Sequence, residues 1–230
     1  KAIVDSLSSI FTFGLQGVAT TPLQCLGLSG YVHELSFWMI FPVFVTSIVF
    51  ITVVLWSGVQ RERSGAEVGL LERVLPPVLQ IMFVLYPLVT TAAFEGFPCY
   101  EFENDQRGWL IADVSIECYT SEHDDAMALA WIAVFIYPIG MWLCTLLLLF
   151  RTSKAITSGR STSLSRAISF LHREYDVQCF WWELMEMGRK FLLVGLFVWQ
   201  PAQGSMTQIA VGTIVAAVYL MIQLQARPYK

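Results

Sequence analysis

Long apolar runs without a single charged residue constrain this chain more than any other feature. Each is about as long as the roughly 20 residues that a helix needs to cross the hydrocarbon core of a bilayer. The four runs are Phe37–Trp56, Val74–Phe94, Ala126–Phe150 and Met206–Leu224. The chain is only 14% charged, whereas about a quarter of the residues in ordinary soluble domains are charged. The sequence therefore predicts an all-α, polytopic membrane protein.

A fifth candidate span carries charges. The stretch FWWELMEMGRKFLLVGLFVWQP, residues 180–201, is apolar in its second half but polar in its first half. Trp181 and Trp199 would be about 27 Å apart along a helix, close to the thickness of the hydrocarbon core, and tryptophan favours membrane interfaces. We therefore predict a bundle of about five spans, with Trp181, Trp182 and Trp199 as membrane-interface residues. The predicted spans are 37–56, 74–94, 126–150, 181–200 and 206–224.

The charges of the fifth span are Glu183, Glu186, Arg189 and Lys190. Helical spacing places Glu186 three residues before Arg189 and four before Lys190, so opposite charges share one face. Charges within a span cost about 2.5–3.5 kcal/mol each on insertion scales. Two interpretations follow. Either the basic side chains extend to nearby headgroups, or the group is a buried charge cluster that positions the helix and rearranges when the protein changes state.

The distribution of basic residues predicts the orientation of the chain. If the segment before Phe37 is outside and the chain crosses five times, twelve of the fourteen Lys and Arg residues fall on the inner side, and only Lys1 and Arg107 fall outside. Cytoplasmic loops are enriched in these residues. We therefore expect the N-terminal segment and the 95–125 loop to lie outside, and the C-terminus to be cytoplasmic.

The N-terminal segment, residues 1–35, has apolar side chains at helical spacing, followed by Pro22 and a glycine-containing stretch. It is expected to hold an amphipathic helix and a linker. The helix either lies on the outer membrane surface or is the end of a truncated sixth span. Residues 36–230 are expected to form the transmembrane bundle.

The predicted outer loop, 95–125, is acidic and contains nine of the eighteen carboxylates. Such a loop is either a solvated surface or a region that raises the local concentration of cations. Because it lacks the ligand spacing of an EF-hand, no metal site is predicted. A Cys99–Cys118 disulfide would stabilise the fold by roughly 3 kcal/mol in the loop-entropy model. Cys25 is an alternative partner for either cysteine.

The predicted inner loop, 151–180, is polar and basic, and Leu164–Leu171 is expected to form a short helix along the inner surface. Prolines and glycines inside the spans have two interpretations. They either adjust helix packing, since both residue types are common in membrane helices, or act as hinges where the helix bends. The candidate hinges are Pro87, Pro138 and Gly140.

No feature of the sequence indicates an enzyme. The three histidines lie outside the predicted spans, and nucleotide-binding, nucleophile-elbow and metalloprotease motifs are missing from the sequence. No cofactor is predicted. With no soluble basic patch, nucleic acid is not an expected partner. The expected partners are the lipid bilayer and either further copies of the chain or other members of a larger membrane complex.

Four blocks of sequence carry a resemblance to a known family. They are CYEFENDQRGWLIADVSIECYTSEH from Cys99, IYPIG from Ile136, WWELMEMGRKFLLVG from Trp181 and ARPY from Ala226. In this order they resemble the C-terminal membrane region of large multi-pass surface proteins of algae, oomycetes and other protists. That region is described as similar to the transmembrane core of transient receptor potential (TRP) channels. The resemblance covers about residues 22–230.

The resemblance implies a TRP-like domain in the plasma or flagellar membrane that acts as a cation channel subunit, or as a mechanosensor linked to extracellular structural proteins. The sequence departs from a six-span channel at QPAQGS, the segment that joins the last two spans, because it is too short for a pore helix and filter. The alternative is a non-conducting membrane anchor for a large extracellular structural or adhesive assembly.

Overall fold

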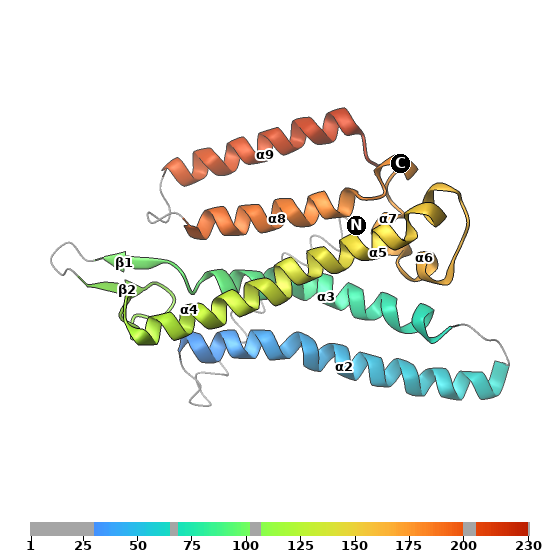
Figure 1. Ribbon diagram of the computed structural model, residues 1–230, viewed down its shortest axis with the longest axis horizontal. Helices are drawn as coiled ribbons and strands as arrows, with labels where there is room; N and C mark the ends of the chain where they lie inside the picture. Colours follow the sequence, from blue (N-terminus) through green and yellow to red (C-terminus); the bar gives the residue numbers. More distant parts are fainter. Residues whose placement is uncertain (1–29, 65–68, 102–106, 200–205, 230) are drawn as a thin grey trace.

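The computed structural model describes residues 30–64, 69–101, 107–199 and 206–229, which are helical apart from connections and one short hairpin (Figure 1). The long helices are α2 (Tyr31–Ser64), α3 (Leu70–Phe94), α4 (Ser121–Val134), α5 (Gly140–Thr157), α8 (Trp182–Trp199) and α9 (Met206–Ala226). The short elements are strands β1 (Cys99–Glu101) and β2 (Gly108–Leu110), the π-helix η1 (Phe135–Ile139), α6 (Ser163–Ala167), α7 (Ser169–His172) and the 3-10 helix η2 (Val177–Cys179). The predictions for residues 1–29, including the partner of Cys25, lie outside the described residues.

Within the described residues, four helical segments are long and apolar enough to cross a membrane. They are Tyr31–Gly58, Leu71–Phe94, Ser121–Thr157 and Met206–Ala226. These segments contain the four uncharged runs of the sequence, so the prediction of an all-α membrane bundle is confirmed. The fifth predicted span also forms a helix, α8, but it carries four charges, and its crossing of the membrane stays a prediction.

The first helix begins earlier than the sequence predicts. α2 starts at Tyr31 and ends at Ser64, rather than running from Phe37 to Trp56, so the end of the expected N-terminal linker is helical. The start of α2 is fixed from a distant part of the chain, because the Asp113 carboxylate accepts a hydrogen bond of 2.9 Å from the Tyr31 backbone N–H. Gly30 precedes it with a φ of 110°, a conformation that favours glycine. A helix cap supplied by a loop far along the chain has no local sequence signal.

The long helices run roughly side by side along the long axis of the molecule (Figure 1). Strands β1 and β2 lie at one end, here called the hairpin end. Helices α6 and α7 and the C-terminal tail, residues 227–229, lie at the other, here called the tail end. α3 is central and packs against α2, α4, α6 and α8, whereas α9 packs mainly against α8. The molecule is therefore a main bundle with α9 attached along one side.

The core has one part at each end. At the hairpin end, Tyr31, Leu35 and Trp38 of α2 pack against the alanine-rich faces of α3 and α4, where small side chains allow helices to approach closely. At the tail end, Ile168 and Leu171 of the α6–α7 connector are fully buried among α3, α5 and α8. The helix predicted over Leu164–Leu171 therefore exists as two short helices. These helices pack against the bundle through Ile168 and Leu171, and their position along the inner membrane surface stays a prediction.

The irregular part of the long α4–α5 segment coincides with two of the three candidate hinges. The π-helix η1 contains Pro138, and the Gly140 backbone N–H donates to the carbonyl of Phe135. Single-turn π-helices of this kind are frequent at functional sites. By contrast, α3 is continuous through Pro87.

The close approach at Gly96 gives a test of the hairpin-end packing. A Cβ at Gly96 would clash with the Tyr31 hydroxyl and lie 2.8 Å from Tyr31 Cζ, while that hydroxyl donates to the carbonyls of Ala92 and Ala93. Gly96→Ala is therefore expected to destabilise the protein by about 1–3 kcal/mol through overpacking, measured as a lower Tm in nanodiscs. Gly58→Ala is the matched control, since nothing lies within 4 Å of its Cβ. Equal Tm values for the two variants would contradict this packing.

Candidate functional site at the charged half of α8

The first half of α8 is held on several sides at the tail end. Trp182 and Met187 are buried at 1% and 2% exposure. The carbonyl of Leu184 accepts a 3.2 Å hydrogen bond from the Trp142 indole of α5, and the carbonyl of Met187 accepts one of 3.4 Å from the Tyr86 hydroxyl of α3. The charged half of this helix is therefore a fixed part of the bundle.

Glu186 is the centre of the polar contacts. One of its carboxylate oxygens forms an ion pair of 2.9 Å with Arg189. The other accepts hydrogen bonds from the hydroxyls of Tyr219, at 2.6 Å, and Tyr229, at 3.3 Å. Tyr219 belongs to α9 and Tyr229 to the C-terminal tail, so one carboxylate joins three segments. We call Glu186, Arg189, Tyr219 and Tyr229 the Glu186 cluster.

Arg189 connects the same elements through its guanidinium plane. Its Cζ lies 4.5 Å from the centroid of the Tyr219 ring, within the range of a cation–π contact. Its Nε is buried and has no hydrogen-bond partner among the described residues. Lys190 is exposed. Of the two predicted partners of Glu186, Arg189 forms an ion pair with it, whereas Lys190 forms none in the part of the chain that the structure describes and acts on the carboxylate only through its nearby positive charge.

Glu183 forms a second link, to a different segment. The Tyr175 hydroxyl donates a 2.8 Å hydrogen bond to its carboxylate, and Tyr175, at 1% exposure, pairs with Tyr229 in an isolated β-bridge. The Asp176 backbone N–H also donates to the carbonyl of Pro228, at 2.8 Å. The C-terminal tail is therefore folded back onto the connector that precedes α8.

The tyrosines outside the helices stay protonated over the usual range of pH. Burial, followed by the negative charge of Glu186, raises the pKa of Tyr229 to about 12. Burial, followed by the charge of Glu183, raises the pKa of Tyr175 well above its ordinary value. Both hydroxyls therefore remain hydrogen-bond donors to carboxylates, and their contacts do not depend on titration near neutral pH.

The predicted interface tryptophans differ in their surroundings. Trp181 is 40% exposed, as an interface residue should be, and Trp199 is the last residue of α8. Trp182 is instead a core residue, with its ring centroid 6.2 Å from that of Tyr219. Its assignment to the interface was wrong, because the α8–α9 contact covers it.

Sequence reasoning missed the tyrosines. Tyr219 and Tyr229 complete the Glu186 cluster, and Tyr175 is the partner of Glu183. Of the three, the sequence analysis includes only Tyr229, as part of the ARPY block. A tyrosine on an otherwise apolar helix such as α9 needs a hydrogen-bond partner for its hydroxyl when buried. Tyr219 and Glu186 are both polar groups in apolar helices, and each needs a hydrogen-bond partner. That shared need is the signal that could have paired them.

A cavity of about 260 Å³ lies beside the same half of α8. Its lining includes Tyr86, Pro138, Trp142, Gly188 and Phe191. The candidate hinge at Pro138 therefore shares a cavity wall with α8, immediately next to the segment that carries the Glu186 cluster.

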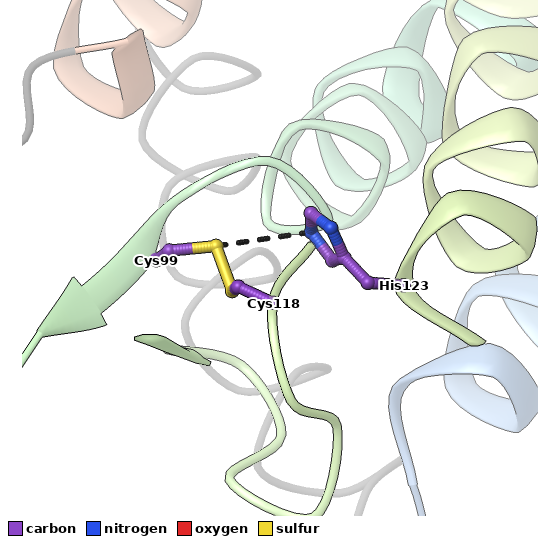
Figure 2. A group of neighbouring side chains, drawn as sticks. All are labelled: Cys99, Cys118 and His123. Carbon is purple, nitrogen blue, oxygen red and sulfur yellow. Dashed lines mark hydrogen bonds between the residues drawn. A yellow bond between two sulfur atoms is a disulfide. The ribbon is translucent and has the colours of Figure 1, made fainter. Parts of the chain in front are cut away.

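At the hairpin end, the predicted Cys99–Cys118 disulfide is confirmed. Cys118, which follows β2, is folded back onto β2 by the 2.8 Å hydrogen bond from its backbone N–H to the Gly108 carbonyl. The disulfide then joins it to Cys99 of β1. Figure 2 shows His123 of α4 facing this disulfide. Asp113 is the second fixed point. Burial opposes its ionisation, but hydrogen bonds from the Ser115 side chain and the Tyr31 backbone outweigh burial and lower its pKa.

Comparisons with known proteins identify no family. No family model matches the chain, and no solved structure matches it. The chain is 25% identical over 171 residues to cysteine repeat modular protein A of Toxoplasma gondii. The match covers 69% of this chain but only 5% of the length of that protein.

A buried carboxylate at the hairpin end predicts a pH dependence of stability. Burial, followed by the negative charge of Glu34, raises the pKa of Glu95 to about 7. The folded state therefore binds a proton more tightly than the unfolded state does. This contribution favours folding at low pH and is lost as pH rises from about 4.5 to about 7, by up to about 3 kcal/mol. Glu95→Gln is expected to raise Tm at pH 8 more than at pH 5, in scans of the detergent-solubilised protein.

Glu122→Gln is the matched control for this measurement, because Glu122 is an exposed carboxylate at the same end. An equal gain in Tm at both values of pH for Glu95→Gln would contradict the raised pKa.

Proposed function

We propose that this chain is a TRP-like membrane domain that acts as a cation channel subunit or mechanosensor linked to extracellular material. The observation that carries the proposal is the Glu186 cluster. It connects α8 to α9 and to the C-terminal tail through one carboxylate. An element that holds two helices and a tail together by a few polar contacts can exist in a closed and an open arrangement, as switching proteins require.

The energetics favour two distinct arrangements over a gradual one. An ion pair that is taken out of water and then broken leaves an uncompensated charge, which costs several kcal/mol. The cluster is therefore expected to be either fully formed, or opened far enough for water or headgroups to solvate Glu186 and Arg189. A movement of α9 away from α8 provides that opening.

The loose attachment of α9 supports an assembly of several copies. α9 packs mainly against α8, and large apolar side chains such as Ile214, Leu220 and Leu224 are exposed along it. In a bilayer, the exposed side of α9 that carries these side chains would contact lipid or another subunit. A homo-oligomer that brings several α9 helices together is the arrangement in which a cation path would form.

The positions of the basic residues support an inward-facing tail end. From the last two turns of α5 to the start of α8 the chain carries five basic residues, Arg151, Lys154, Arg160, Arg166 and Arg173. This segment, with α6 and α7, lies at the tail end (Figure 1). The hairpin end, with Arg107 and the disulfide, then faces outward, as expected for an oxidising compartment. We place the domain in the plasma or flagellar membrane with this orientation.

A second function has its own support. The matched T. gondii protein is named as a modular cysteine-repeat protein, and the matched part is 5% of its length. A small membrane domain within a large modular protein would serve as an anchor for an extracellular assembly. The short segment between α8 and α9 also favours this alternative, since it offers no room for a pore helix.

Cation flux into liposomes distinguishes the two functions. The complete protein, inserted and folded, is expected to give flux above that of empty liposomes under voltage or membrane tension. Glu186→Gln weakens the cluster, and a loss of about 1–2 kcal/mol would shift a closed–open equilibrium by about 5–30-fold. The variant should therefore show a higher basal flux.

Lys154→Gln is the matched control, since it removes an exposed positive charge from the end of α5, outside the Glu186 cluster, and should leave flux unchanged. No flux from the inserted wild-type protein under either stimulus would contradict the channel proposal and favour the anchor.

A further inference from the structure

The disulfide at the hairpin end has a histidine as its polar neighbour. His123 Nε2 lies 3.8 Å from Cys99 Sγ (Figure 2). The two sulfur atoms and one nitrogen of this imidazole all lie within 4.8 Å of one another. Both Cys118 and His123 are 4% exposed. Two sulfur atoms and an imidazole thus share a small volume that is buried on the side of Cys118 and His123 and partly open to solvent at Cys99.

In the disulfide-bonded form, neither ring nitrogen of His123 has a strong hydrogen-bond partner within the described part of the chain. Its Nδ1 has no hydrogen-bond partner among the described residues, although most buried polar side-chain atoms in proteins have one. Its Nε2 faces a disulfide sulfur, which is a weak acceptor. If His123 served only to fill space, an apolar side chain would do so without the cost of burying two ring nitrogens. This cost points to a second form of the site in which the imidazole has a stronger partner.

Three separate elements bring the ligands together. Cys99 lies in β1, Cys118 follows β2, and His123 is in the first turn of α4, whose N-cap Thr120 accepts from the His123 backbone N–H. Between Cys118 and the helix, Tyr119 adopts a φ of 65°. A left-handed conformation is costly for a bulky residue and persists where surrounding structure enforces it. The backbone thus holds the cysteine pair and the histidine against each other.

We propose that reduction of the Cys99–Cys118 disulfide turns this group into a Zn²⁺ site with two thiolates and His123 Nε2 as ligands. A dithiol supplies the two electrons: its own sulfurs become a disulfide, and Cys99 and Cys118 each receive a hydrogen as thiols. Binding of Zn²⁺ then releases both thiol protons. The fourth position is filled by water. This inference does not depend on the channel or anchor proposal.

The dimensions suit this metal. Zn²⁺ binds sulfur at about 2.3 Å and imidazole nitrogen at about 2.0–2.1 Å in tetrahedral geometry, which separates a sulfur ligand from a nitrogen ligand by roughly 3.5 Å. The present separation of Cys99 Sγ and His123 Nε2, 3.8 Å, is already close to that value. The Cα atoms of the two cysteines are 6.4 Å apart, so rotation of the cysteine side chains suffices to separate the sulfurs. Thiolates and imidazole are ligands that suit zinc, whereas hard cations such as Mg²⁺ and Ca²⁺ bind mainly to oxygen ligands.

The consequence is an exchange of one cross-link for another. The oxidised loop is closed by a covalent bond, and the reduced loop by a metal that also fastens β1 to α4. Both α4 and the loop residue Asp113 contact the start of α2. A shift of the loop or of α4 when the disulfide is exchanged for the metal would therefore act on α2.

Binding of Co²⁺ tests the proposal with a spectroscopic readout. The complete protein in nanodiscs, with Cys25, Cys144 and Cys179 replaced by serine, is reduced with a dithiol that is then removed under nitrogen. We expect Co²⁺ to produce thiolate charge-transfer bands and tetrahedral d–d bands only after reduction, and Zn²⁺ to abolish them. His123→Ala should weaken Co²⁺ binding by more than the roughly 10–100-fold that is lost when a residue that only supports a metal ligand is replaced. His172→Ala, at the opposite end, should have no effect.

Alkylation of the unsubstituted protein provides a second measurement that needs no variant. After reduction, Zn²⁺ is expected to slow the modification of Cys99 and Cys118 by iodoacetamide, but not that of Cys179, as followed by mass spectrometry of the peptides. Absence of the cobalt bands in the reduced protein, or unchanged alkylation of both cysteines with Zn²⁺, would overturn the proposal. Equal Co²⁺ affinity in folded His123→Ala would remove histidine from the site.

Discussion

The Glu186 carboxylate is the interaction on which the tail end of this molecule depends. A charge inside a membrane span costs about 2.5–3.5 kcal/mol even on the mildest scales, so α8, with four charges, could cross a membrane only if most of them are compensated. Here Glu186 is compensated by Arg189 within the same helix, and by two tyrosine hydroxyls from elsewhere in the chain. The compensation thus fixes the position of α9 and the C-terminal tail as well as that of α8.

The two ends of the bundle are held by different kinds of chemistry. At the hairpin end, a disulfide and the Asp113 contact with the start of α2 act on a tightly packed core of tyrosine, tryptophan and alanine side chains. At the tail end, the polar connections are hydrogen bonds and partly exposed ion pairs, among them Glu186–Arg189 and Glu72–Arg166, which rearrange at low cost compared with a covalent bond. If the protein changes state, movement is therefore expected at the tail end, with the hairpin end as the fixed reference.

The sequence predicted the elements whose signal is local. Uncharged runs of about 20 residues identified the four apolar spans, and the spacing of Cys99 and Cys118 identified the disulfide. Helical spacing also identified the Glu186–Arg189 pair. These predictions succeeded because each depends on composition or on residues within a few turns of one another.

The parts that could not be predicted depend on contacts across the chain. Asp113 fixes the start of α2 from a loop far along the sequence, so the helix begins at Tyr31 instead of Phe37. Trp182 has the sequence surroundings of an interface residue, but α9 covers it. The partners of Glu186 on α9 and the tail have no fixed spacing from it, and the only hint was that a carboxylate and a tyrosine in apolar helices each need a partner.

A double-mutant cycle on Glu186 and Tyr219 tests the central claim most directly. The free energy of unfolding is measured in mixed micelles for the wild type, Glu186→Gln, Tyr219→Phe and the double variant. If the carboxylate holds α9 against α8, the two substitutions are coupled by at least about 1 kcal/mol, because a hydrogen bond to a charged group contributes about 1.5–3 kcal/mol. Additive effects, within the roughly 0.3–0.5 kcal/mol found for independent sites, would contradict it.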